Sequence, residues 1–116
     1  MERKKWVDIK NKILGKEYDL SIVSAKDDLM KKLNSVYRNK YKTTNTLSFS
    51  LSKEMGEIFI NITLAKKEAA KAKIPSEQYI DYLFTHSILH LKGYAHGKRM
   101  REEENKIMKN LWGKTL

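Results

Sequence analysis

The sequence predicts an α+β fold, a small mixed β-sheet packed with about five helices. Three short segments alternate between apolar and polar residues, as strands with one buried face do (18–23, 45–51 and 58–62). Five further segments have the spacing or composition of helices, and the fourth of these is apolar on nearly all sides. A helix of that kind is buried, so we expect it to be the central helix of the fold.

The first predicted helix covers residues 3–14, and the first strand covers residues 18–23. The apolar residues of the helix recur at helical spacing, at Trp6, Ile9, Ile13 and Leu14. Gly15 follows, where a left-handed residue ends many helices. The strand alternates through Tyr18, Leu20 and Ile22.

The second predicted helix begins near Ser24 and runs through about Arg38. Ser24 is a candidate N-cap, with Asp27 three residues later. The expected core face is formed by Leu29, Leu33 and Val36, with Met30 and Tyr37 beside them.

Two further strands are expected to pair around a turn at Gly56. The apolar face of residues 45–51 is expected to hold Leu47, Phe49 and Leu51. The partner strand is expected to alternate through Ile58, Ile60 and Ile62. Three helices then complete the chain: a short one at about 64–72, the longest at about 76–92, and an amphipathic one at about 98–112. The inward residues of the last helix are expected to be Met100, Ile107, Met108 and Leu111, with residues 101–103 outward.

Composition excludes several classes of protein. At 116 residues and 41% hydrophobic content the chain is long enough for a core, so we expect a single domain over residues 1–116. The chain has no cysteine, which excludes disulfides, Cys-based zinc fingers and thiol nucleophiles. It has neither the apolar region of a signal peptide nor a run approaching the roughly 18 residues of a membrane span. We therefore expect a soluble, cytoplasmic protein that does not insert into a membrane.

The formal net charge of +10 indicates a polyanionic partner. Nucleic acid is the favoured partner, and a merely solvated basic surface is the alternative.

All three histidines of the chain lie within residues 86–96, as His86, His90 and His96. The first two are four residues apart and share one face of a helix, and Gly93 lets the chain turn back to bring in the third. Such imidazoles can share one Zn²⁺ at Zn–N distances of roughly 2.0–2.1 Å, with a fourth position left for water. The metal would lower the pKa of that water toward about 7, and a phosphodiester is the natural electrophile for so basic a chain.

Two other interpretations of the histidines are weaker. Buried histidines often serve packing alone, but burying three imidazoles without partners costs roughly a few kcal/mol each. The spacing also matches the metzincin proteases, which need a Glu directly after the first His as general base. Ser87 stands at that position and cannot accept a proton at neutral pH, so a protease is disfavoured.

Three ordered blocks of sequence carry a family resemblance. They are Leu33-Asn34-Ser35-Val36-Tyr37-Arg38 followed by Thr44-Asn45-Thr46-Leu47-Ser48-Phe49-Ser50, then Gly56-Glu57-Ile58-Phe59-Ile60, then residues 86–96. Together they resemble the bacterial YbeY family of metal-dependent endoribonucleases. Ser50, Ser87 and Ala95 replace the Pro, Gly and Asp of the family pattern, and the family's usual first strand is missing ahead of the first helix.

The resemblance implies a zinc-dependent, single-strand-specific endoribonuclease acting in 16S rRNA 3′-end maturation and ribosome quality control. The implied partners are RNA and the ribosome or preribosome, with no small-molecule cofactor. Arg38 matches a family arginine and is the candidate catalytic residue, because a guanidinium can hold two phosphate oxygens. The alternative for Arg38 is a surface cation at a helix C-terminus. Two other functions stay open: a ribosome-assembly factor with a mainly structural metal, and a metal hydrolase of another substrate class.

Several further residues are weaker candidates. RNA contacts are conceivable for Lys40, Lys42 and Lys98, and base stacking for Tyr37, Tyr41 and Tyr94. Solvated charge and ordinary packing are the favoured interpretations. Residues 102–104 are three glutamates that we interpret as a charged helix surface rather than a source of a general base.

Overall fold

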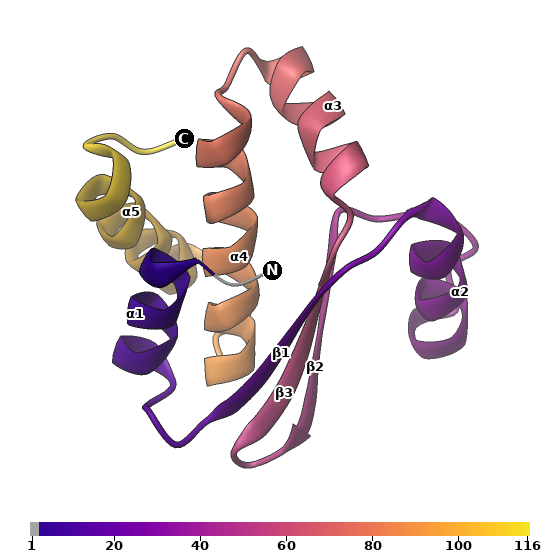
Figure 1. Ribbon diagram of the computed structural model, residues 1–116, viewed down its shortest axis with the longest axis horizontal. Coiled ribbons are helices and arrows are strands. Elements are labelled where there is room, and N and C mark those ends of the chain that lie inside the picture. The colour runs from indigo at the N-terminus through magenta and orange to yellow at the C-terminus, as the bar shows by residue number, and fades with distance from the viewer. Residues whose placement is uncertain (1–2) are drawn as a thin grey trace.

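The computed structural model describes residues 3–116 (Figure 1). The elements in chain order are α1 (Lys4–Ile13), β1 (Asp19–Ser24), α2 (Asp27–Arg38), β2 (Thr46–Ser52), β3 (Met55–Ile60), α3 (Ile62–Ala72), α4 (Ser76–Lys92) and α5 (Lys98–Trp112). The predicted α+β class, with a small mixed sheet and about five helices, is confirmed. No helix within residues 3–116 is long and apolar enough to cross a membrane.

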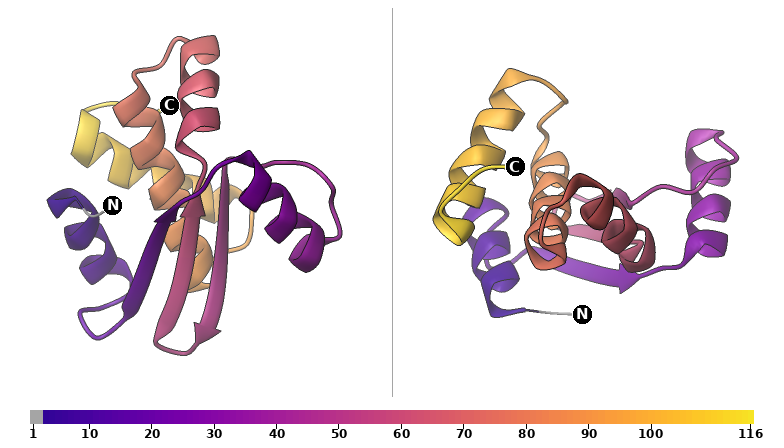
Figure 2. Two further views of the ribbon diagram at one scale, coloured as in Figure 1. Left: turned by 45° about the vertical axis from the view of Figure 1, so that its right-hand side comes forward. Right: turned by 90° about the horizontal axis from the view of Figure 1, so that it is seen from above.

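The sheet lies between α2 and the other helices. Its strand order is β1-β3-β2, with β1 parallel and β2 antiparallel to the central β3. Ile58 and Ile60 belong to the main core with α4, whereas Phe59 and its neighbour Leu47 belong to a smaller core with Met30 of α2. Figures 1 and 2 show α2 on one side of the sheet and α1, α4 and α5 on the other.

Helix α4 is the buried centre of the fold, as predicted. Phe84 of α4 stacks on Trp6 of α1 with ring centroids 4.3 Å apart and planes 3° from parallel. Asp81, one turn earlier on α4, accepts hydrogen bonds from the indole of Trp6 (2.7 Å) and the indole of Trp112 (2.9 Å). Lys5 Nζ also lies 2.6 Å from this fully buried carboxylate. The first and last helices are therefore both attached to α4 at one residue.

Helix α2 corrects two predictions. Ser24 is not an N-cap, because it ends β1 and pairs with Ile60 in the parallel ladder, so the helix begins only at Asp27. The predicted core face is wrong in part: Leu29, Val36 and Tyr37 are exposed, whereas Met30 is buried and Leu33 packs against it as predicted. The physical reason is that α2 packs against the sheet along a single narrow stripe, and the rest of the helix faces solvent.

Gly56 does not form the predicted turn but lies buried inside β3, and the chain turns just before Met55. A Cβ at position 56 would collide with the hydroxyl of Tyr18 and approach the backbone oxygen of Phe49 at 3.2 Å. Glycine is needed here for close packing. Leu51 is 54% exposed at a register shift between Ser50 and Ser52, so the predicted apolar face of β2 is buried only in part.

Candidate metal centre and cleft

The candidate site is built at the end of α4 and in the turn that follows. His86 and His90 lie one helical turn apart, with ring centroids at 4.6 Å. The helix ends at Gly93, whose φ of +115° suits a glycine, and the chain turns back through Gly97. This turn brings the ring of His96 within 5.1 Å of the first imidazole and 4.5 Å of the second. One ligand nitrogen from each histidine lies within 4.8 Å of the others.

Hydrogen bonds fix which ring nitrogens face the centre. His86 Nδ1 donates to Glu104 Oε2 on α5 at 2.5 Å, and His90 Nδ1 donates to the backbone oxygen of Tyr94 at 3.1 Å. Both acceptors place a proton on Nδ1, so in the neutral imidazoles each Nε2 carries a lone pair. These two Nε2 atoms lie 3.1 Å apart, close enough for one cation to bind both. A tetrahedral zinc site separates neighbouring nitrogens by about 3.3 Å, so the donor set fits such an ion.

The electrostatic surroundings keep His90 neutral. Burial lowers the pKa of His90, and the neighbouring His86 and His96 and the Arg38 guanidinium lower it further, against an opposing effect of the hydrogen bond to Tyr94. A neutral imidazole at physiological pH has the free lone pair that a metal ligand needs.

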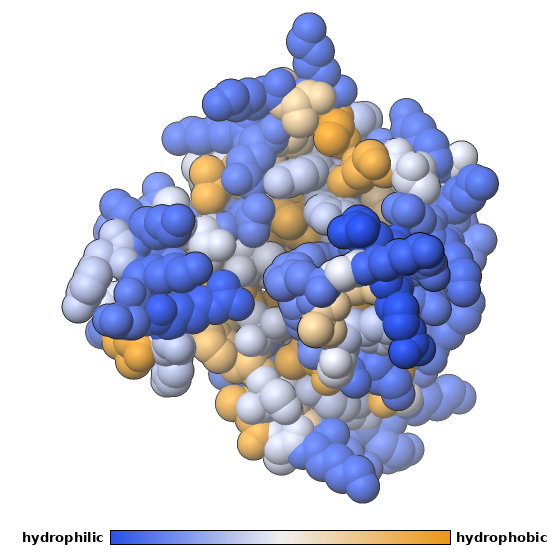
Figure 3. All heavy atoms as spheres, turned by 180° about the vertical axis from the view of Figure 1, so that it is seen from behind, coloured by the Kyte–Doolittle hydropathy of each residue, from blue (hydrophilic) through white to orange (hydrophobic). Residues whose placement is uncertain are grey.

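The histidines open into a cleft of about 320 Å³ between α4, β2 and the end of α2. We call it the histidine cleft, and it is lined by Arg38, Thr44, Asn45, Thr46, Ser48, Tyr79, Tyr82, Leu83, His86, Ser87, His90 and His96. Figure 3 shows the molecule from behind relative to Figure 1. This rear face is hydrophilic over most of its area, with hydrophobic residues near its centre.

One end of the histidine cleft is held by Glu68 of α3. This carboxylate accepts hydrogen bonds from Asn45 Nδ2 and from the Tyr79 hydroxyl, each at 3.0 Å. Burial and the hydrogen bond to Glu68 raise the pKa of Tyr79 to about 12. The phenol therefore stays protonated at physiological pH and holds its position on the wall of the cleft.

Arg38, the candidate catalytic residue, is one of the residues that line the histidine cleft. It is the last residue of α2, where Asn39 ends the helix in the left-handed conformation. Its side chain is exposed and lines the histidine cleft. The weaker candidates Lys40, Lys42, Lys98, Tyr37, Tyr41 and Tyr94 do not line that cleft.

Glu104 contacts the candidate metal ligand His86 and was not predicted to do so from the sequence. The interpretation of residues 102–104 as a charged surface is wrong for Glu104, which is only 4% exposed. It lies on the buried stripe of α5, four residues from both Met100 and Met108. This spacing indicates that Glu104 lies on the same buried face as the two methionines. A carboxylate buried on an apolar stripe requires a partner.

Two of the residues that depart from the family pattern have clear surroundings. Ser87 is buried; its hydroxyl donates to the backbone oxygen of Leu83 at 2.9 Å and accepts a bond from Thr46 Oγ1 at 2.7 Å. It thereby attaches α4 to β2 beside the histidines. Ala95 is exposed. The carboxylate that contacts the histidine cluster is that of Glu104, at His86 Nδ1.

Fold and site together define an α+β protein whose buried central helix and following turn carry three converging histidines in an open cleft, a grouping compatible with a metal site. A sequence model described as endoribonuclease YbeY matches residues 2–116. The chain belongs to the endoribonuclease YbeY family, which confirms the resemblance seen in the sequence.

Individual relatives agree with this assignment. An endoribonuclease YbeY of Wolbachia (strain wRi) is 42% identical over 98 residues, covering 80% of this chain and 63% of the relative. One from Nautilia profundicola is 39% identical over 111 residues, covering 90% of this chain and 78% of the relative. A solution structure of a Thermotoga maritima protein superposes with a TM-score of 0.70 and 27% identity, over 95% of this chain and 78% of that one. The chain thus spans somewhat less than two thirds of the Wolbachia relative.

Proposed function

We propose that this chain is a zinc-dependent endoribonuclease for single-stranded RNA, with His86, His90 and His96 as its metal ligands. We further propose that it acts in the cytoplasm on ribosomal RNA, in maturation of the 16S rRNA 3′ end and in ribosome quality control. The observation that carries the metal assignment is the convergence of three histidine nitrogens within 4.8 Å, with hydrogen-bond acceptors at Nδ1 of His86 and His90 that leave Nε2 to face the centre. Family membership supports RNA as the substrate.

A zinc ion bound to these imidazoles would act as a Lewis acid toward a phosphoryl oxygen and lower the pKa of water. Three neutral protein ligands and an open side are the composition of catalytic rather than structural zinc sites. The exposed side of His96 and the polar walls of the histidine cleft leave room for a substrate.

The chain's own residues would bind and orient the phosphodiester. The Arg38 guanidinium faces the histidine cleft with donors that match two phosphate oxygens, and it would stabilise negative charge developing on them. Hydroxyls of Thr46 and Ser48 line the same wall and can hydrogen-bond sugar or phosphate groups. The net charge of +10 would raise the local concentration of RNA.

The direct test is cleavage of a single-stranded RNA by zinc-loaded protein, compared with His90→Ala, Arg38→Ala and chelator-treated protein. Arg101→Ala is the matched control for Arg38→Ala, because it removes an exposed arginine from α5 that does not line the histidine cleft. We expect the parent and Arg101→Ala to cleave and the other three samples to lose activity. Circular dichroism of each variant shows whether it folds.

Three outcomes would contradict the proposal. Equal cleavage by the parent and by folded His90→Ala would place the activity outside this site. RNA binding without cleavage by any sample would instead favour a ribosome-assembly factor with a structural metal. Protein that fails to bind RNA even at low salt would favour another substrate class.

A further inference from the structure

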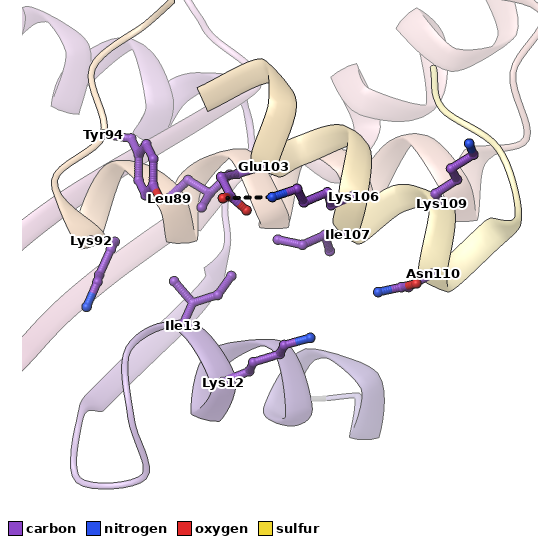
Figure 4. Close-up of a pocket in the computed structure, with 10 residues that line it drawn as sticks. All are labelled: Lys12, Ile13, Leu89, Lys92, Tyr94, Glu103, Lys106, Ile107, Lys109 and Asn110. Carbon is purple, nitrogen blue, oxygen red and sulfur yellow. Dashed lines mark ion pairs between the residues drawn. The ribbon is translucent and has the colours of Figure 1, made fainter. Parts of the chain in front are cut away.

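A second, larger depression lies between α1, the end of α4 and α5, and we call it the α1–α5 groove. Its volume is about 640 Å³, and four lysines line it: Lys12, Lys92, Lys106 and Lys109. Figure 4 shows Ile13, Leu89 and Ile107 directed into the space between the helices. The groove therefore has an apolar floor and a cationic rim.

The rim carries excess positive charge. Glu103 is the only acidic residue that lines the groove, and it pairs with Lys106 at 3.5 Å (Figure 4). Within residues 3–116, Lys12, Lys92 and Lys109 form no ion pair with a carboxylate. Three exposed ammonium groups around one groove therefore have no counter-charge in the described part of the protein.

The groove is connected to the histidine cleft by the turn after α4. Lys92 and Tyr94 line both the α1–α5 groove and a shallower depression over residues 92–99. His96 lines both that depression and the histidine cleft. Lys98 and Arg99 add two cations along this path. A continuous basic track therefore runs from the candidate metal ligands to the α1–α5 groove.

We propose that the α1–α5 groove binds single-stranded RNA at nucleotides several positions away from the phosphodiester to be cleaved. This inference rests on the proposed endoribonuclease function and extends it to the path of the substrate. The lysines match the regularly spaced phosphates of the RNA backbone. The apolar floor and the Tyr94 ring match the faces of unpaired bases, which a duplex does not expose.

The test compares the affinities of a short and a long single-stranded RNA, of about four and about twenty nucleotides. The groove variant is Lys12→Ala, Lys92→Ala and Lys109→Ala combined. The matched control combines Lys53→Ala, Lys66→Ala and Lys71→Ala, which removes the same charge from exposed positions outside these depressions. Fluorescence anisotropy over a series of salt concentrations gives each affinity.

We expect the parent and the control to bind the long RNA about tenfold or more tightly than the short one, and the groove variant to lose most of that advantage. The salt dependence for long RNA should also fall by roughly 0.7 in logarithmic slope for each phosphate contact removed. The proposal would be overturned if the groove variant and the control lost equal affinity for the long RNA. It would also be overturned if polyglutamate displaced the RNA as effectively as unlabelled RNA does. In either case net charge alone would explain binding. These binding measurements stand apart from cleavage, so failure of the parent to cleave RNA would contradict the proposed function and not this inference.

Discussion

Glu104 of α5 accepts a hydrogen bond from His86 of α4, with 2.5 Å between Oε2 and Nδ1. The two residues are eighteen positions apart and meet because both lie on the packed faces of their helices. The carboxylate fixes the tautomer and ring orientation of His86 and directs Nε2 toward the other imidazoles. Such partners of a metal ligand raise its basicity and hold its geometry.

We predict that Glu104→Gln weakens zinc binding by about 10–100-fold, the range found for substitutions of this kind. The amide keeps nearly the same shape but loses the negative charge that stabilises the proton on Nδ1. Zinc affinity is measured by competition with a chromophoric chelator, and nitrogen NMR of His86 reports its tautomer. Glu102→Gln, which neutralises an exposed glutamate on the same helix, should leave both readouts unchanged. Wild-type affinity and tautomer in Glu104→Gln would show that the contact only packs α5 against α4.

We predict that Gly56→Ala lowers the free energy of unfolding by about 1–3 kcal/mol, because the added methyl group overpacks the site beside Tyr18. The Tyr18 hydroxyl is buried without a hydrogen-bond partner in the described residues, so Tyr18→Phe should cost little by itself. In the double variant, removal of the hydroxyl should recover part of the loss. Urea unfolding of all four proteins gives the coupling energy. Strict additivity would mean that Leu91 and the Phe49 backbone, the other close neighbours, cause the damage.

We predict that Asp81→Asn lowers the free energy of unfolding by about 3–5 kcal/mol, because an amide cannot accept both indole hydrogen bonds and leaves Lys5 without its buried partner. Trp6 and Trp112 are the only tryptophans of the chain, so their fluorescence reports directly on this contact during urea unfolding. Glu77→Gln is the control, since it removes an exposed ion pair worth about 0.2–1 kcal/mol. A loss no larger than that of the control would show that the helices are held by their apolar contacts alone.

The histidine cluster was predictable because its geometry is mostly local. His86 and His90 are one helical turn apart, and a glycine after the helix is a reliable sign that the chain turns. The same reasoning predicted α4 as the buried helix, because its apolar residues surround the axis. Where a structural rule acts over a few residues, the sequence was sufficient to predict its consequence.

The errors arose where a residue's role depends on a distant element. Leu29 and Val36 have the spacing of a core face, but α2 meets the sheet along another stripe, which the helix's own sequence does not determine. Gly56 was predicted to form a turn, but glycine is needed there for another reason. The Tyr18 hydroxyl, which comes from a distant segment, leaves no room for a side chain at position 56. Glu104 is next to two other glutamates in the sequence and next to a histidine in space. Contacts of this kind become visible only when the packing of the elements is known.

Asp27 connects the starts of α2 and α3 to the loop before β2. Its Oδ1 accepts hydrogen bonds from Asn61 Nδ2 at 2.6 Å and from Thr43 Oγ1 at 3.0 Å. Asn61 in turn accepts a bond from the backbone N–H of Leu64 and so caps α3. The hydrogen bonds from Asn61 and Thr43 lower the pKa of Asp27, against a smaller opposing effect of desolvation.

We predict that the Asp27 contribution to stability is lost in acid. A carboxyl group whose pKa is lower in the folded state contributes its full stabilisation above the unfolded-state pKa of about 3.9, and loses it as the pH falls through the folded-state value. The free energy of unfolding of the parent, measured with urea between about pH 6 and about pH 3, should therefore approach that of Asp27→Asn as the pH falls. The three histidines are present in both proteins, so their contribution cancels and the difference between the two curves isolates Asp27. A difference that stays constant from pH 6 to pH 3 would show that the ionised carboxylate contributes no more than the amide, and that Asp27 holds Asn61 and Thr43 by shape alone.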